Sequence, residues 1–335
     1  MTSIEDTLIL VESAKKRLRA EHNLPAIGVD DTFDNCCGTL FNAILSDSRK
    51  NDAKAKMNSA DDACFYFTVS KWALAKVAYR FNSSFLRALA DTEDSPIQTD
   101  ALATLPHKAF WVSSSVRTED NAGMLLYVEP CPGGCLVSCV LVNEDSRKGI
   151  GWRQCSLWLT NGQSVGEAMQ EMLAAAGVGD IIGDGSFAKD RELVDEYTES
   201  IRLAIQCAYY LSAQNAEVKN VTAKKNSRPV RPDGTRFNIR KWDVGFRVGA
   251  DFEKLCTTAA AASCAGCGGG EAKRPHVRRA HWHHFWTGKG RAVLVVRWLA
   301  PIAVNAETPD DISPIEHRVT GEMDTSTAGA SRTNI

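Results

Sequence analysis

The hydrophobic pattern of this chain changes its period near Leu105-Pro106, and this change restricts the fold more than any other feature. Before it, apolar residues recur at intervals of three and four, which is typical of amphipathic helices. After it, short apolar runs are separated by turn-forming residues, which is typical of strands joined by tight turns. The pattern predicts an α+β fold, with a helical N-terminal region followed by an antiparallel sheet with packed helices.

Three helices are expected in the first hundred residues, and two more after the first strands. Their apolar residues recur at helical spacing, and Ser164 with Glu167 has the pattern of a capping box at the start of the fourth. The expected ranges are 4–21, 33–45, 61–90 with a break near 82–84, 164–175 and 190–216. These segments are long enough to cover a sheet.

Four short strands are expected in the middle of the chain, and two more in its last third. Turn signals such as Pro132-Gly133, between the second and third, and Asn161-Gly162, after the fourth, delimit the first four, which favours an antiparallel meander. The expected ranges are 109–116, 123–129, 135–142, 152–160, 243–248 and 291–299.

The same changes of pattern divide the chain into regions. We expect a helical N-terminal region, an α+β region with a β-meander and two helices, a basic loop with a strand and a flexible linker over 257–270, a C-terminal His/Trp/Arg motif with the last strand, and a disordered tail. Their ranges are 1–100, 101–218, 219–270, 271–305 and 306–335.

Charge is distributed unevenly along the chain although the net charge is only -2. From Lys219 to Arg297 there are 17 Lys or Arg against 5 Asp or Glu, so this segment carries +12 and the rest of the chain -14. A basic segment on an acidic body favours an anionic partner such as nucleic acid, a ribosome or an acidic peptide.

The N-terminus and the cysteines indicate a bacterial cytoplasmic location without membrane contact. The chain begins with acidic residues where a secretory signal would be basic, and no apolar run approaches the ~18 residues that a membrane span needs. The 11 cysteines lie mostly in apolar segments, so we expect buried thiols rather than disulfides.

The segment Lys273–Trp286 concentrates more chemistry than any other stretch. It holds four of the seven histidines and two of the eight tryptophans, together with four cations. Such a set could bind a metal, a nucleic-acid backbone, or an acidic or extended peptide.

A metal site is the sharpest of these alternatives, but the spacing argues against it. Cys264 and Cys267 precede His276, His281 and His283, yet this is not the spacing of a standard zinc finger. A hydrolytic metal site usually recruits carboxylates, and the segment has only one nearby acid. We therefore expect no metal and no cofactor, and no catalytic residue is assigned.

A strand over this segment would alternate its side chains between two faces. One face would carry Arg279, His281, His283 and Phe285, and the other Arg278, Trp282, His284 and Trp286. One face would then be core and the other a recognition site, with arginines holding carbonyls or acidic groups and tryptophans forming apolar walls. The candidate binding residues are His276, Arg278, Arg279, His281, Trp282, His283, Trp286, Arg297 and Trp298.

The C-terminal motif resembles the second family of type V-A anti-CRISPR proteins and its relatives on mobile elements. The residues that carry the resemblance are Lys273 to His283, then Trp286, Gly288, Gly290, Val296-Arg297-Trp298, Pro301 and Val304-Asn305, with weaker stretches at Leu105-Pro106 and Gly162 to Val165. The cysteine-rich segment and the longer polar tail depart from the family pattern.

The resemblance implies a binding or regulatory protein rather than an enzyme. It would lower production of the type V-A effector nuclease by recognising the nascent N-terminal peptide of that nuclease and triggering loss of the translated mRNA. The implied partners are that peptide, the ribosome and the mRNA. The alternative from the residues themselves is an RNA-binding module or RNA-cleaving enzyme of a mobile element, with arginines on phosphates and histidines in acid/base work.

Overall fold

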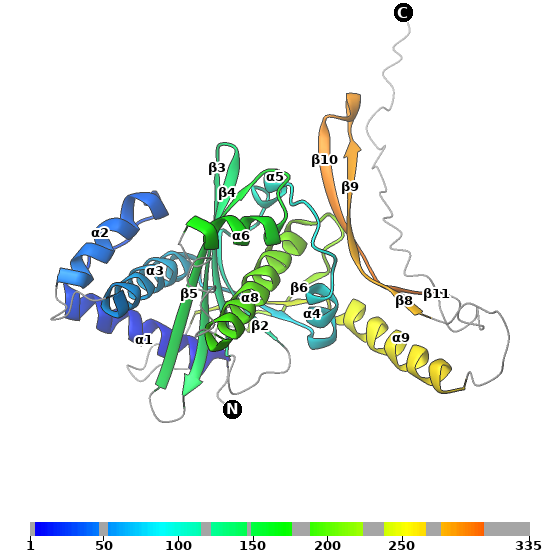
Figure 1. The fold of residues 1–335 in the computed structure, drawn as a ribbon, viewed down its shortest axis with the longest axis horizontal. Helices are drawn as coiled ribbons and strands as arrows, with labels where there is room; N and C mark the ends of the chain where they lie inside the picture. Colours follow the sequence, from blue (N-terminus) through cyan, green and yellow to red (C-terminus); the bar gives the residue numbers. More distant parts are fainter. Residues whose placement is uncertain are drawn as a thin grey trace, which may run out of the picture.

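The computed structural model describes residues 4–46, 53–114, 122–145, 149–175, 188–223, 238–265 and 276–304 (Figure 1). Its helices are α1 (Ile4–His22), α2 (Phe33–Ser46), α3 (Ala53–Ala75), α4 (Ser83–Ala90), α5 (Thr99–Leu102), α6 (Val165–Ala175), α8 (Ala188–Ser212) and α9 (Phe246–Ala265). Its strands are β1 (Val77–Phe81), β2 (Ala109–Ser114), β3 (Gly123–Cys131), β4 (Gly134–Asp145), β5 (Gly149–Thr160), β6 (Val218–Asn220), β7 (Arg240–Val244), β8 (His276–Arg278), β9 (His281–Thr287), β10 (Val293–Leu299) and β11 (Ile302–Val304).

A seven-stranded mixed sheet forms the centre of the molecule, in the order β5-β4-β3-β2-β1-β7-β6. Strands β2 to β5 form the predicted antiparallel meander, and β1 is parallel to both of its neighbours, β2 and β7. The predicted fold class is confirmed: an antiparallel-rich sheet with packed helices follows a largely helical N-terminal region.

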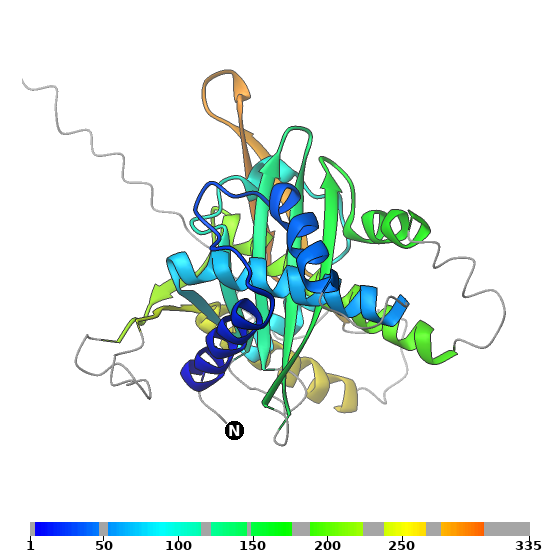
Figure 2. The same cartoon turned by 90° about the vertical axis from the view of Figure 1, so that its left-hand side faces the viewer.

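The two faces of this sheet support separate hydrophobic cores. Helices α1, α2 and α3 lie over one face, as Figure 2 shows, and Ala78 and Trp111 point toward them. The neighbouring residues Tyr79 and Val112 point into the opposite core, beneath α4, α6 and α8. Successive strand residues alternate between the two faces, and both faces of β1 are covered by a core. Nearly every residue of β1 is therefore buried.

The prediction that residues 77–81 continue a helix was wrong, because they form β1. Helix α3 ends at Ala75, and Lys76 adopts a left-handed backbone with φ of 50°. A strand buried on both faces reads as a continuous apolar run, so its sequence shows no alternation that would separate it from the preceding helix.

Two further expectations after residue 240 also need correction. Strand β7 ends at Val244 because Gly245 turns the chain with φ of 65°, so 246–248 are helical rather than extended. Residues 257–265 continue α9 instead of forming a linker, which agrees with the high helix propensity of their alanines. The rest of the predicted linker, most of the basic loop and the tail lie outside the described residues.

A two-stranded ribbon, β9 with β10, projects from the edge of the body (Figure 1). Two indoles fix its base. Trp282 is buried and donates from Nε1 to Oε1 of Gln206 on α8 at 2.6 Å. Trp298 is buried and donates from Nε1 to Oγ1 of Thr92 at 3.1 Å. The base of the ribbon is therefore part of the core beneath α4 and α8.

His284 adds a third attachment, through a hydrogen bond between its Nε2 and the hydroxyl of Tyr209 at 3.0 Å. Burial, and next the neighbouring His283, lower the pKa of His284. Burial raises the pKa of Tyr209 to about 12, so this hydroxyl keeps its proton at neutral pH.

None of the described helices combines the length and the apolar character that a membrane span requires.

Replacing Gly245 with alanine should destabilise the fold by about 2–4 kcal/mol, because the side chain is strained at positive φ and clashes with a core ring. A Cβ at this position would lie 2.1 Å from Cδ1 of Phe85. Gly38→Ala is the matched control. Nothing lies within 4 Å of its added Cβ, so we expect about 0.5–1 kcal/mol of stabilisation in α2. Urea unfolding of both variants checks this, and equal midpoints would contradict it.

The fold should lose stability on acidification in part through His284. An unfolded histidine binds a proton near pH 6.5, whereas the folded His284 does so only at lower pH, so the free energy of unfolding falls as pH drops through this window. In His284→Gln the drop between pH 8 and pH 5.5 should be smaller than in the wild type, measured by urea unfolding. His281→Gln, on the opposite face of the same strand, is the control, because His283 itself contributes to the lowered pKa of His284. Identical drops in the wild type and His284→Gln would refute the prediction.

Candidate functional site

The predicted motif lies on and beside the projecting ribbon. The predicted alternation of residues 281–286 is confirmed: His281, His283 and Phe285 share one face of β9, and Trp282, His284 and Trp286 share the other. The second face turns toward the body, because Trp282 is buried and His284 bonds to α8. The first face is therefore the outer face of the ribbon.

Two of the predicted binding residues, Trp282 and Trp298, lie in the core rather than at the surface. Their exposed fractions are 6% and 2%, and they are directly paired across the ribbon. The rings of Tyr209 and Trp282 meet edge to face, with centroids 4.7 Å apart. In this position the two indoles support the ribbon from beneath.

The outer face gathers an aromatic, an imidazole and a cation. The rings of His283 and Phe285 have centroids 4.1 Å apart, and the guanidinium carbon of Arg297 lies 5.3 Å from the centroid of Phe285. The Nε of Arg297 donates to Oε1 of Gln214 at 2.8 Å. This contact fixes the direction of the guanidinium, whose remaining donors can meet a carbonyl or carboxylate.

The upper half of the ribbon exposes apolar side chains. Trp286 is 60% exposed and Val293 is 54% exposed. The turn between the strands carries the cations Lys289 and Arg291, with Gly290 at φ 72°. An exposed indole beside cations is the kind of surface that binds peptides or nucleic acid.

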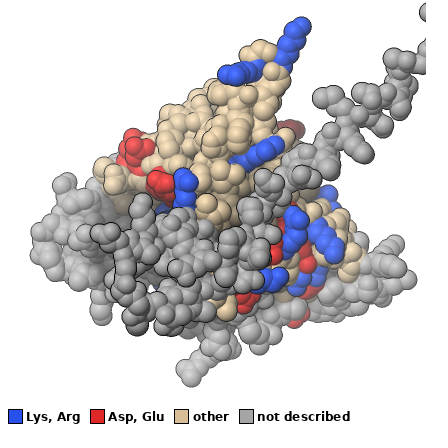
Figure 3. Space-filling model, turned by 90° about the vertical axis from the view of Figure 1, so that its right-hand side faces the viewer, with Lys and Arg blue, Asp and Glu red and all other residues tan. Residues whose placement is uncertain are grey.

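The remaining predicted residues lie at the base of the ribbon. Arg278 and Arg279 are exposed and His281 is half-buried. His276 starts β8 and pairs with Val304, but its side chain is outside the described set. Figure 3 shows Lys and Arg at the tip of the protrusion and again nearer the body, where acidic side chains also occur. Cations therefore lie at both ends of the ribbon: the predicted Arg278 and Arg279 at its base, and Lys289 and Arg291, which were not among the predicted residues, in its turn.

A hollow of about 620 Å³ lies between the ribbon and the body, and no pattern in the sequence indicated it. Its lining comes from four separate parts of the chain: residues 98–104, Asn161, residues 212–214, and Trp286 with residues 292–296. Asp100 is the one charged side chain among the described residues that line it. The hollow depends on how the ribbon docks on α5 and α8, which no local pattern encodes.

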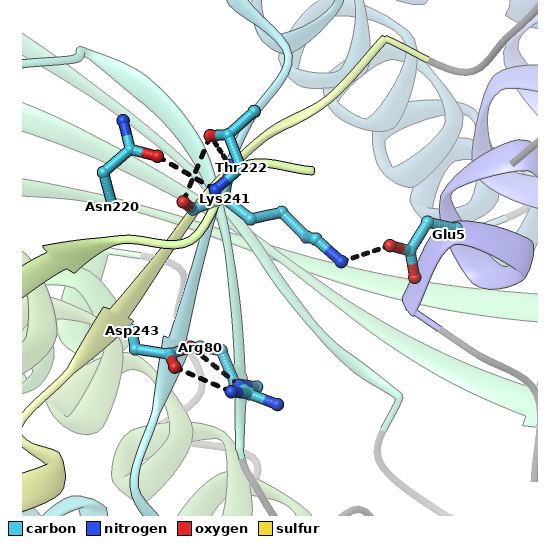
Figure 4. Close-up of polar contacts among 6 residues, drawn as sticks. All are labelled: Glu5, Arg80, Asn220, Thr222, Lys241 and Asp243. Atoms are coloured by element: carbon cyan, nitrogen blue, oxygen red, sulfur yellow. Dashed lines mark hydrogen bonds and ion pairs between the residues drawn. The ribbon is translucent and has the colours of Figure 1, made fainter. Parts of the chain in front are cut away.

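A second pocket, of about 350 Å³, lies on the other side of the sheet beside the start of α1. Figure 4 shows its polar contacts: Lys241 reaches Glu5, and Arg80 meets both carboxylate oxygens of Asp243, at 2.8 and 2.7 Å. The two cations are balanced by the two acids. These contacts join α1, β1 and β7 and lie apart from the predicted motif.

Where side chains are described, no group of three or more His, Cys, Asp or Glu comes together as ligands. Cys267 and the side chains of Cys264 and His276 lie outside that set.

Comparison with known proteins places these features in a family. No curated protein matches the chain in sequence. A solved structure described as the crystal structure of AcrVA2 is similar with a TM-score of 0.49 at 16% identity, over 88% of this chain and 94% of that chain. The model of the AcrVA2-like family, described as the anti-CRISPR type V subtype A2 family, matches residues 79–306, a span that runs from β1 to just past the ribbon. This match covers more than half of the chain, which therefore belongs to the anti-CRISPR type V subtype A2 family.

Proposed function

We propose that this protein lowers production of a type V-A effector nuclease. It recognises the N-terminal peptide of the nuclease as the peptide emerges during translation, and this recognition triggers loss of the mRNA. The observation that carries the proposal is the ribbon, which holds an exposed indole and a half-buried aromatic–cation group on its two faces, within a chain of the anti-CRISPR family.

The ribbon suits a peptide partner for two physical reasons. Trp286, at 60% exposure, offers a large rigid apolar surface that loses little entropy on binding. Arg297, held by Gln214, offers donors whose direction is already fixed, so less freedom is lost when a carbonyl or carboxylate binds. Arg278 and Arg279 at the base add positive charge, which favours contact with the ribosome or its RNA.

No step of this proposal requires the protein itself to cut RNA. The imidazole of His284 bonds to Tyr209, and that of His283 lies against Phe285. These contacts give both imidazoles a role in packing or binding, so the proposal needs neither of them as a catalytic acid or base. Loss of the message would then be carried out by a nuclease of the host.

A reporter separates peptide recognition from RNA recognition. The first codons of a type V-A nuclease are fused to a fluorescent protein, and message and protein are measured with and without this chain. Synonymous recoding keeps the peptide and changes the RNA, so repression should persist. A compensated frameshift keeps most of the RNA and changes the peptide, so repression should disappear. Repression that follows the RNA instead would overturn the proposal.

Trp286→Ala should weaken repression of this reporter by about tenfold or more, because truncating an aromatic anchor at the centre of an interface typically has an effect of that size. Trp158→Ala is the matched control. Trp158 is also exposed, at 45%, but lies on the edge strand β5. Both variants should keep the wild-type unfolding midpoint. Equal repression by Trp286→Ala and Trp158→Ala would exclude the ribbon as the recognition surface.

An RNA-binding module is the second candidate, favoured by the exposed cations at both ends of the ribbon. In that case, affinity for RNA should fall steeply with salt. The logarithm of the association constant should fall linearly with the logarithm of the salt concentration, with a slope of about minus one per phosphate contact. Filter binding of purified protein to RNA at two salt concentrations measures it. Cleavage that is lost in His281→Ala would point instead to an RNA-cleaving enzyme.

A further inference from the structure

The outer edge of β10, the edge away from β9, is satisfied near the body by residues that follow α8. The N–H of Trp298 donates to Oδ1 of Asn215 at 3.1 Å, and its carbonyl accepts from Nδ2 of Asn215 at 2.8 Å. Two residues earlier in β10, the carbonyl of Val296 accepts from the backbone N–H of Gln214 at 3.0 Å. The side-chain amide of Asn215 thus makes the pair of hydrogen bonds that a neighbouring strand would make.

The same edge continues to Leu294, where this pairing stops. In an antiparallel ladder the N–H and carbonyl of one residue point the same way, and the direction alternates along the strand. The backbone groups of Trp298 and Val296 point outward, so those of Leu294 do too. The backbone groups of Val293 and Val295 face β9. Neither backbone group of Leu294 has a hydrogen-bond partner among the described residues.

The space beside this edge has room for an extended polypeptide segment. Leu294 lines the hollow of about 620 Å³, together with Gln214 at one end and residues 98–104 along the far wall. The exposed Trp286 pairs with Leu294 across the ribbon, so the two side chains share the face that borders the hollow. An open donor and acceptor, a space alongside and an apolar wall are the features that strand-adding sites use.

We infer that an extended peptide from another protein adds to this ribbon as a third strand. It lies in the hollow and pairs with the N–H and carbonyl of Leu294, directly beyond Asn215. An alternate side chain of the peptide packs on Trp286. Asp100, the one charged residue in the described lining, favours a peptide with a positive charge close by, either a basic side chain or a free α-amino group.

This inference rests on the proposed function for the identity of the peptide, but not for the way in which the peptide binds. It assigns the backbone pairing of the peptide to the inner side and edge of the ribbon, next to Trp286, whereas Phe285 and Arg297 on the outer face remain available for other contacts with the same partner.

Leu294→Pro tests the backbone contact, with Leu294→Ala as its matched control. Both variants lose the leucine side chain, but only proline loses the N–H. Proline is tolerated on an edge strand where its nitrogen faces outward, and the bonds from Val293 and Val295 to β9 remain. We expect Leu294→Pro to bind peptide about tenfold more weakly than Leu294→Ala, the size of one hydrogen bond. Equal affinities would overturn the inference.

The peptides provide a second measurement that leaves the protein unchanged. N-methylation at alternate positions of a bound strand removes amides that face the ribbon, whereas methylation at the intervening positions does not. Affinity should therefore fall in one of the two N-methyl series only. An equal effect in both series would also overturn strand addition, even if Leu294→Pro proved unstable.

The probe is a peptide array that tiles the N-terminal region of a type V-A nuclease beside unrelated extended peptides of equal length. Binding of nuclease peptides that is insensitive to Leu294→Pro would refute strand addition and leave the proposed function intact. Binding of unrelated peptides only, with loss in Leu294→Pro, would support strand addition and refute the proposed partner. Absence of binding by the wild type to every peptide would refute the inference.

Residues 305–335 of the same chain are the competing occupant. Hydrogen exchange at the amide of Leu294 distinguishes them. The amide should exchange rapidly in the full chain alone and slow when a bound peptide is added. Protection in the full chain without peptide, lost in a chain that ends at Val304, would assign the edge to the tail instead and overturn binding in trans.

Discussion

The burial of β1 on both of its faces is the constraint on which the rest of the structure depends. Val77 and Tyr79 belong to one core and Ala78 to the other, so this strand needs a helical layer on each side. It is also parallel to both neighbours, and parallel strands require long crossover connections. The segment between β1 and β2, which includes α4 and α5, therefore has to pass over one face. That passage brings α5 to the side of the hollow.

A series of aromatic contacts links this central strand to the ribbon. The rings of Phe81 and Phe85 are stacked with centroids 6.2 Å apart, and Phe85 meets Trp298 edge to face at 5.1 Å. Tyr210 of α8 contacts the same two rings, Phe85 at 4.6 Å and Trp298 at 6.0 Å. The base of the ribbon is thus continuous with the core, while its upper half, with Trp286, remains exposed. This division gives a rigid support to a surface that is free to bind.

The sequence predicted well what local pattern determines and poorly what tertiary contacts determine. The meander from β2 to β5 was predicted because consecutive short apolar runs are separated by strong turn residues such as Pro132-Gly133. The start of α6 was predicted because Ser164 and Glu167 cap it reciprocally. Strand β1 was missed because burial on both faces removes the period of two, and the end of α9 was missed because small residues are also common in linkers.

The candidate site shows the same limit. Alternation separated the two faces of residues 281–286, but the sequence did not tell which face is buried, since an indole in a core and an indole in a binding site both require apolar surroundings. Trp282 and Trp286 lie on the same face, yet one is 6% and the other 60% exposed, because α8 reaches only the lower part of the ribbon. The contact of Asn215 with Trp298 joins residues 83 positions apart, beyond any sequence pattern.

An exposed strand edge normally invites aggregation, and proteins limit it by covering or charging it. Here Gln214 and Asn215 cover the edge of β10 at Val296 and Trp298, and the cations of the turn follow beyond its far end. Only a short stretch around Leu294 stays open among the described residues. So short an edge offers few backbone hydrogen bonds, each of which adds about tenfold in affinity at most. Selectivity for one peptide must then come from the walls beside the edge, where Trp286 and Asp100 lie.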